Sequence, residues 1–337
     1  MKIGKIDLNK QVLIVAEIGN NHEGNFSVAQ KLVQEAASCG VDAVKFQTFK
    51  TEHYVSHSDR ARFERLKSFE LSQEQFTELS QLARSLNLIF ISTPFDLGSA
   101  EFLAPLVDCY KVASSDNTFY PLIRQITTTG KSLIISCGLS NFSEIQNTVK
   151  FVEQQSIDIQ EKLAILHCVS SYPVPKDQAN LRSIQFLADR FNCTVGYSDH
   201  TLGIEAAVLA VGLGARIIEK HFTLDRHYSD FRDHQLSADP KDMEMLVNQI
   251  RRATLMLGQY NKNVQPCEKP LIRALRRSII AINSLPCGHR LTELDLTWVR
   301  PGGGVPPGEE NVLVGKILKR NIKSGQQILI RDVESFK

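Results

Sequence analysis

The stretch VLIVAEIG (12–19), together with the helical segment that follows it, is the pattern that decides the fold. Near-continuous apolarity over four to seven residues is typical of a parallel strand that is buried on both faces. In residues 26–36, apolar side chains recur every three or four positions, as on one face of a helix. The remaining runs of the same kind are DAVKFQT (42–48), IFISTP (89–94), CYKVAS (109–114), SLIISCG (132–138), LAILHCV (163–169), CTVGYSD (193–199) and RIIEKHFT (216–223).

Eight such runs alternating with helical segments over roughly 250 residues predict a (β/α)8 barrel. Three helix starts also have recognisable caps: Ser72 with Gln75, Asn141 with Glu144, and Asp239 before a proline. An open, doubly wound sheet could use the same elements. The dinucleotide motif G-x-G-x-x-G does not follow the first run, however, and this disfavours a dinucleotide-binding fold.

The alternation of apolar runs and helical segments ends near residue 259. Prolines and a basic run predict an exposed connection, and the following β-like runs SIIAINS, ILKRNI and QQILIR are interrupted by glycines and prolines. We therefore predict a barrel domain over 1–260, a linker over 261–276 and a small β-rich domain over 277–337. About 60 residues is close to the lower limit for independent folding, so this domain is expected to be stabilised by packing against a partner surface.

Composition excludes several classes of function. The chain has 337 residues with 39 basic and 37 acidic side chains, and a net charge of +2 does not indicate a nucleic-acid or membrane surface. No apolar run approaches the roughly 20 residues of a membrane span, and the polar amino terminus does not resemble a secretory signal. The seven cysteines are scattered without a C-x-x-C pair, which predicts reduced thiols in a cytoplasmic protein.

Polar side chains gather where the predicted strands end, which is where barrel enzymes carry their reacting groups. Lys45 and Lys111 lie inside predicted strands, and an unpaired buried ammonium costs several kcal/mol, so each needs an anion. That anion is either a substrate phosphate or carboxylate, or a neighbouring glutamate, Glu17 or Glu219. The hydroxyls available for a substrate anion belong to Thr93, Ser114, Ser136 and Ser198.

His200 and His221 fall at the ends of the last two predicted strands. A lone histidine is more often a hydrogen-bonded core residue than a metal ligand, but a pair on adjacent strands forms a reasonable divalent-metal site. The residues alone therefore predict a barrel enzyme that handles a phosphorylated anion with a divalent metal. Cys137 and Cys168 are expected to be packing thiols, because neither has an obvious base beside it in the sequence.

Eight phrases at the strand ends together resemble the sialic acid (N-acetylneuraminate) synthase family, which also includes synthases of legionaminic, pseudaminic and sialic-9-phosphate acids. They occur in order as VAEIGNNHEGN (15–25), DAVKFQTFK (42–50), STPFD (92–96), YKVASSD (110–116), SCGLS (136–140), LHCVSSYPVP (166–175), GYSDHTLG (196–203) and EKHFTLD (219–225). The tail 277–307 is similar to the family's C-terminal SAF domain, which resembles type III antifreeze protein.

The resemblance implies that phosphoenolpyruvate (PEP) condenses with an open-chain N-acylated amino sugar, releasing phosphate by C–O cleavage. It implies that His200 and His221 bind Mn²⁺ or a similar divalent ion. It assigns catalytic roles to Glu17, as general acid or base, and to His221. The residues it assigns to PEP are Lys45, Thr93, Lys111, Ser114, Ser136, Ser170 and Ser198. Those it assigns to the sugar are Gln47, Asp116, Tyr172 and Asp233.

The family forms domain-swapped homodimers, so the resemblance also implies that the SAF domain of one subunit covers the barrel mouth of the other. Arg300 matches the family arginine that reaches the N-acyl group of the partner's substrate. The chain departs from the family at Phe231-Arg232-Asp233-His234, where many members have Gly-Pro-Asp-His. Arg232 is either a surface arginine or a sign of a sugar with an extra anionic or hydrogen-bond-accepting group.

Two alternatives stay open. One is another PEP-dependent 3-deoxy-sugar-acid synthase that acts on an aldose phosphate. The other is a carbohydrate-binding protein that has kept the barrel and lost its chemistry. The presence of both lysines, both histidines and Glu17 argues against such a loss.

Overall fold

Residues 1–155 and 159–334 are described by the computed structural model, in which the chain divides into two units, Met1–Gly258 and Gln259–Lys337. The predicted linker falls within the second unit, where it includes the short helix α12 (Ile272–Leu275). No helix in the described ranges combines the length and apolar character that a membrane span requires.

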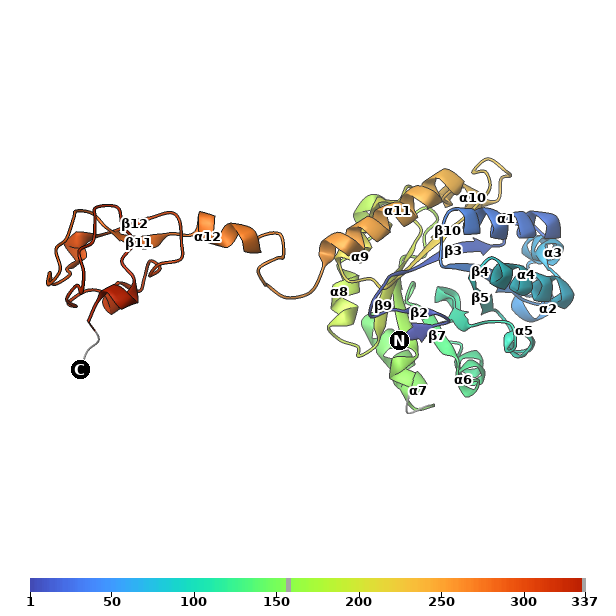
Figure 1. Ribbon diagram of the computed structural model, residues 1–337. Coiled ribbons are helices and arrows are strands. Elements are labelled where there is room, and N and C mark those ends of the chain that lie inside the picture. Colours follow the sequence, from blue (N-terminus) through green and yellow to red (C-terminus); the bar gives the residue numbers. More distant parts are fainter. Residues whose placement is uncertain (156–158, 335–337) are drawn as a thin grey trace. The chain divides into compact units, whose positions relative to one another are not determined.

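The first unit is a closed barrel of parallel strands surrounded by helices (Figure 1). The predicted (β/α)8 barrel is therefore confirmed, and each predicted apolar run contains one barrel strand. Around the barrel the strands follow chain order, and the last strand pairs with the first. They are β3 (Leu13–Gly19), β4 (Ala43–Thr48), β5 (Ile89–Pro94), β6 (Cys109–Val112), β7 (Ser132–Ser136), β8 (Leu163–Cys168), β9 (Thr194–Asp199) and β10 (Ile217–His221).

Helices connect successive strands, and all three predicted caps are present. The side chains of Ser72 and Asn141 form capping boxes, and the side chain of Asp239 accepts a hydrogen bond from the backbone N–H of Asp242. The helices are α1 (Phe26–Ser38), α2 (Thr51–Tyr54), α3 (Arg60–Phe69), α4 (Gln73–Ser85), α5 (Leu97–Leu103), α6 (Tyr120–Thr128), α7 (Phe142–Glu153), α8 (Ser183–Ala188), α9 (Glu205–Gly212), α10 (Arg232–Leu236) and α11 (Pro240–Leu257).

The barrel interior is apolar near the amino-terminal ends of the strands and polar at their carboxyl-terminal ends. Strand residues near the amino-terminal ends, such as Leu13 and Ile89, form a cluster inside the barrel. A hairpin of β1 (Lys2–Ile3) and β2 (Ile6–Asp7) adds Ile3 and Ile6 to that cluster. The polar strand residues that remain therefore collect at the carboxyl ends of the strands.

The second unit has a separate core around the antiparallel pair β11 (Ser278–Ala281) and β12 (Leu296–Val299). Of the three β-like runs, SIIAINS contains β11. The other two supply isolated bridges rather than strands, among them Leu285 with Ile322 and Ile280 with Gln327. Gly325, with a positive φ of 77°, forms a turn between these two runs, so neither continues into a longer ladder.

Candidate active site

A cavity of about 620 Å³ opens at the carboxyl ends of the barrel strands. Its size falls within the range of pockets for small-molecule substrates. The structure brings thirteen of the predicted site residues to its wall: Glu17, Lys45, Gln47, Thr93, Lys111, Ser114, Ser136, Ser170, Tyr172, Ser198, His200, His221 and Asp233.

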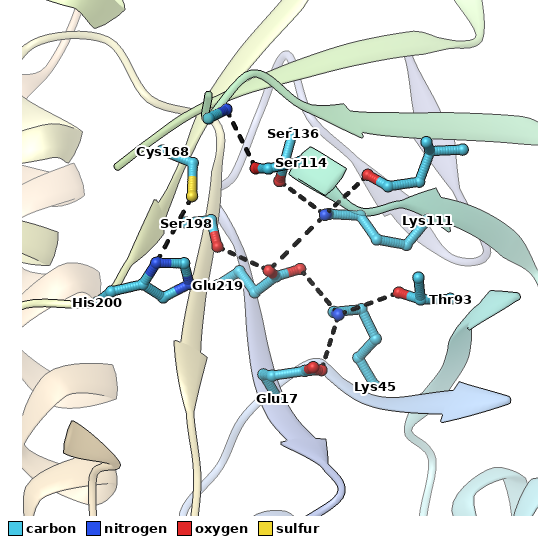
Figure 2. Close-up of polar contacts among 12 residues, drawn as sticks. Glu17, Lys45, Thr93, Lys111, Ser114, Ser136, Cys168, Ser198, His200 and Glu219 are labelled. Carbon is cyan, nitrogen blue, oxygen red and sulfur yellow. Dashed lines mark hydrogen bonds and ion pairs between the residues drawn. The ribbon is translucent and has the colours of Figure 1, made fainter. Parts of the chain in front are cut away.

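Two lysines and two glutamates form a buried charge cluster in this cavity (Figure 2). The ammonium of Lys45 lies 2.8 Å from Glu17 Oε2 and 3.6 Å from Glu219 Oε2. The ammonium of Lys111 lies 3.9 Å from Glu219 Oε1. The pairing with glutamates that the sequence allowed is thus present, and Glu219 lies between both lysines.

The charges in this cluster shift each other's ionisation. Burial raises the pKa of Glu17, and the negative charge of Glu219 raises it further against the opposing effect of Lys45. Burial also disfavours the charged form of Glu219, but Lys111 and Lys45 hold its pKa below the ordinary value. Of the two carboxyl groups, Glu17 is therefore the one better suited to carry and transfer a proton.

Hydroxyl groups surround the two ammonium groups. Thr93 Oγ1 accepts a hydrogen bond from Lys45 at 3.2 Å, and Ser136 Oγ accepts one from Lys111 at 2.7 Å. Ser198 Oγ donates to Glu219 Oε1 at 2.7 Å. Ammonium and hydroxyl donors of this kind are what a phosphate or carboxylate ligand requires.

Ser114 and Ser170 lie against Gly138 at the end of β7. The backbone N–H of Gly138 donates to Ser114 Oγ at 3.1 Å, and Ser170 Oγ is buried without a hydrogen-bond partner. A Cβ on Gly138 would collide with both hydroxyls, so a larger residue here would displace the two serine side chains. The free Ser170 hydroxyl is a further donor for a ligand in the cavity.

The two histidine rings lie side by side, with their centroids 5.3 Å apart. His200 Nδ1 is 2.9 Å from the carbonyl oxygen of Val169, which can only accept, so Nδ1 carries a proton. Burial lowers the pKa of His200, but the neighbouring Cys168 thiol and the Val169 carbonyl outweigh this effect and hold the pKa above its ordinary value. His221 Nδ1 is buried and has no hydrogen-bond partner. Burial, reinforced by the positive charges of His200 and Lys45, holds the pKa of His221 well below its ordinary value. A neutral imidazole with a free lone pair is the form that binds a metal ion.

Two imidazoles therefore fit a divalent metal, but they would supply only part of its coordination. Within residues 1–155 and 159–334, no group of three or more His, Cys, Asp or Glu side chains is arranged to hold a metal ion. The remaining ligands would have to be substrate or water oxygens, as at catalytic sites that keep open positions.

The residues predicted to contact a sugar differ in position: some line the cavity, one lies beside it and one belongs to the second unit. Tyr172 stacks on His200 with a centroid distance of 4.3 Å, and Asp233 Oδ2 lies 4.0 Å from His221 Nδ1. Asp116 does not line the cavity, whereas its neighbour Ser115 does and donates to Asp116 Oδ2 at 2.8 Å. Arg300 belongs to the second unit.

Several cavity residues were missed by sequence reasoning. Cys168, expected to be a packing thiol, lines the cavity with its Sγ 3.6 Å from His200 Nδ1. Its position in register with Ser198 was a usable signal, because residues in register on neighbouring strands point to the same side. Arg62 and Arg65 of α3 also line the cavity, and no spacing pattern pointed to them. Arg232, which the sequence had singled out, lies over the Tyr172 ring at 4.6 Å and lines the cavity, with a side chain that is 69% exposed.

Comparison with known proteins assigns the chain to a family. The NeuB family model matches residues 32–262, and the SAF domain model matches residues 276–334. The chain belongs to the NeuB family. The resemblance seen in the sequence is thus confirmed, as is the SAF domain at the carboxyl end.

Relatives of this NeuB-family chain are named synthases. It is 39% identical to an N,N'-diacetyllegionaminic acid synthase of Legionella pneumophila, over 96% of this chain and 94% of the relative. It is 33% identical to the N-acetylneuraminate-9-phosphate synthase of Mus musculus, over 96% and 92%. A crystal structure of an N-acetylneuraminic acid synthetase from Leptospira borgpetersenii, in complex with citrate, has 34% identity and a TM-score of 0.76, covering 81% of this chain and 94% of that one.

Proposed function

We propose that this protein condenses PEP with an open-chain N-acylated amino sugar to give a nonulosonic acid and inorganic phosphate. The observation that carries the proposal is the convergence of two buried lysines, Glu17 and two neighbouring imidazoles in one cavity of a NeuB-family barrel. The names of the relatives support it, because they are synthases of legionaminic and sialic-9-phosphate acids. A cytoplasmic location stays a prediction from the cysteine pattern.

The proposed reaction forms one C–C bond and breaks one C–O bond. C3 of PEP attacks the aldehyde carbon of the sugar, and the aldehyde oxygen takes up a proton. Water adds to C2 of the resulting cation with loss of one proton. The tetrahedral intermediate then releases phosphate as the C2–O bond to the phosphoryl group breaks, and the new C2 hydroxyl loses its proton to become the carbonyl. Lys45 and Lys111 neutralise the phosphate and carboxylate charges, and Glu17 donates the proton or deprotonates the water.

His200 and His221 would hold a divalent metal ion, Mn²⁺ being the proposed one, beside the PEP site. Such an ion polarises the sugar carbonyl as a Lewis acid when it is bound. The unpartnered His221 Nδ1 and the closeness of the two rings support this assignment. Both rings lie at the cavity wall, and metal binding would displace any proton held at His200 Nε2.

On the sugar side, we assign Gln47, Tyr172 and Asp233 from the cavity wall, with Asp116 beside it. Gln47 Nε2 donates to Glu17 Oε1 at 3.2 Å, which links the sugar contacts to the proposed acid. We further propose a domain-swapped homodimer in which Arg300 of one subunit reaches the acyl group of the other's substrate. The exposed apolar side chains of the second unit, Trp298 and Leu294 among them, support such a contact surface.

The decisive experiment measures phosphate release from PEP with a panel of acceptors. The panel contains N-acyl mannosamines, N-acyl altrosamines, their 6-phosphates and a plain aldose phosphate, each with Mn²⁺ and with EDTA. We expect release with at least one N-acylated sugar and loss of more than about 90% of it after metal removal, because the carbonyl is then unpolarised. Release with the aldose phosphate alone would favour the 3-deoxy-sugar-acid alternative. No release with any acceptor would favour a carbohydrate-binding protein, and full activity in EDTA would remove the histidines from the mechanism.

The Arg300→Ala variant tests the proposed acyl contact. With an N-acylated sugar, kcat/KM should fall about 10- to 100-fold, the usual cost of losing a hydrogen bond from a charged group. With a plain aldose, kcat/KM should change less than about two-fold, because there is no acyl oxygen to lose. Arg331→Ala is the matched control, since Arg331 is another exposed arginine of the second unit. An equal fall for both substrates would contradict the acceptor assignment.

A further inference from the structure

Asp199 of β9 and Lys220 of β10 form an ion pair on the outer side of the barrel wall. The residues just before and just after each of these two along the chain line the cavity. The two strands pair in parallel with Ser198 opposite Glu219 and Asp199 opposite Lys220. Ser198 and Glu219 line the cavity, whereas Asp199 and Lys220 do not, as expected from the alternation of side chains along a strand. The next residue along the chain is in each case a cavity histidine, His200 after Asp199 and His221 after Lys220. The ion pair thus joins the two strands one residue before each histidine.

The pair has a full set of polar partners. Lys220 Nζ donates to Asp199 Oδ2 at 3.0 Å and to the carbonyl oxygen of Thr201. Asp199 Oδ1 accepts from the backbone N–H and the hydroxyl of Thr201, both at 2.8 Å, and from Tyr197 OH at 3.2 Å. With side chains 1% and 0% exposed, it is the most completely buried ion pair within 1–155 and 159–334. All these contacts end on the chain segment around His200 or on the residue before His221.

Stability does not account for a charged pair at this position. Taking two charges out of water costs several kcal/mol each, and a well-packed apolar pair of similar volume is often as stable or more so. What the ion pair adds is geometric definition, because charged hydrogen bonds fix both distance and direction. It adds a side-chain constraint to the pairing of β9 with β10 one residue before the two histidines.

We propose that Asp199 and Lys220 are positioning residues that hold His200 and His221 at the separation a divalent metal ion requires. This rests on the proposed function to the extent that the two histidines are the metal ligands. Metal–nitrogen bonds in zinc sites are about 2.0–2.1 Å and tolerate deviations of only about 0.2 Å. A small displacement of one strand end against the other therefore weakens metal binding, while the lysines and hydroxyls that contact PEP keep their places.

The test is the double variant Asp199→Asn/Lys220→Met in the full-length protein. It removes the ion pair without leaving a lone buried charge, which a single replacement would do. Mn²⁺ binding is measured without substrates, from the electron paramagnetic resonance signal of the free ion. The Kd for Mn²⁺ should rise about 10- to 100-fold, as when other groups that orient metal ligands are removed. At saturating Mn²⁺, the KM for PEP should stay within about two-fold of the wild-type value, because no PEP contact has changed.

A matched control removes an ion pair at the opposite end of the barrel. Arg251 Nη2 lies 2.7 Å from both carboxylate oxygens of Asp42, which precedes β4. Asp42→Asn/Arg251→Met should lower the melting temperature and leave the Kd for Mn²⁺ unchanged. If Mn²⁺ affinity falls equally in this variant, the effect is one of general stability and the positioning role is wrong. It is also wrong if the Asp199/Lys220 variant folds and binds Mn²⁺ like wild type.

A milder variant covers the case in which the double variant does not fold. Thr201→Val removes the hydroxyl that donates to Asp199 Oδ1 and should raise the Kd for Mn²⁺ about two- to ten-fold. An unchanged Kd would contradict the proposal. Wild-type protein that releases phosphate from PEP but binds no Mn²⁺ would overturn the positioning role alone. Wild-type protein that releases no phosphate with any acceptor would overturn the proposed function instead.

Discussion

Replacing Lys111 with methionine should lower kcat/KM for PEP about a thousand-fold. Losing a buried charged partner of an anion costs about 2–5 kcal/mol, and about 4 kcal/mol corresponds to a factor of a thousand. Lys111 is a cleaner target than Lys45, because Lys45 neutralises both Glu17 and Glu219. After Lys111 is removed, Glu219 still has Lys45 and the Ser198 hydroxyl as partners. The measurement is the initial rate of phosphate release as a function of PEP concentration.

Lys131→Met provides the control for this experiment. Lys131 precedes β7 at the opposite end of the barrel, where its ammonium donates to the carbonyl oxygen of Val107 at 2.9 Å, outside the cavity. Its replacement should leave the KM for PEP unchanged. If the Lys111 variant keeps its fold by circular dichroism and also keeps the wild-type kcat/KM for PEP, Lys111 is a structural partner of Glu219 and does not bind PEP.

The barrel could be predicted from the sequence because a strand buried on both faces has a strong compositional signal. Runs such as VLIVAEIG (12–19) contain few polar residues, and every such run proved to contain a strand. The second unit was harder to predict, because its short β-like runs make isolated bridges rather than ladders. In a domain of this size, turns and local contacts outweigh the periodicity on which a strand prediction rests.

The candidate site could be predicted in part, for a reason that follows from strand geometry. Alternation along a strand tells which residues face the cavity, and Lys45 with Gln47 and Glu219 with His221, which it pairs, do line the cavity. It does not tell how far across the barrel two inward side chains reach. That Glu219 contacts both lysines depends on the separation of strands that are not neighbours, which no local pattern encodes.

The sequence did not predict which residues of helices and loops reach the cavity. Arg62 and Arg65 come from α3, and their spacing resembles that of any exposed helix face. Asp116 also depends on the path of a loop, since it lies in the turn Ser114–Asp116 after β6, where Ser115 lines the cavity and Asp116 does not. In both cases the path of the loop decides which side chain reaches the cavity, and that path is set by packing rather than by local propensity.

The charges of the buried cluster balance before any substrate binds. Two ammonium groups and two carboxylates cancel in the buried site, so an arriving PEP anion adds negative charge that a proton or a cation must offset. Glu17 is the group best placed to take such a proton. Its pKa is already raised by burial and by Glu219, and its side chain is linked to the proposed sugar contact Gln47.

Glu17→Gln should therefore lower kcat about 100- to 10,000-fold, the usual contribution of a positioned acid or base. The KM for PEP should change less than about three-fold, because Lys45 keeps its second carboxylate partner, Glu219. Glu101→Gln on the exposed face of α5 is the isosteric control and should behave as wild type. A Glu17 variant in which KM rises and kcat holds would make this residue a partner that orients Lys45. Proton transfer would then be assigned to another carboxyl group at the cavity wall, Asp233 or Glu219.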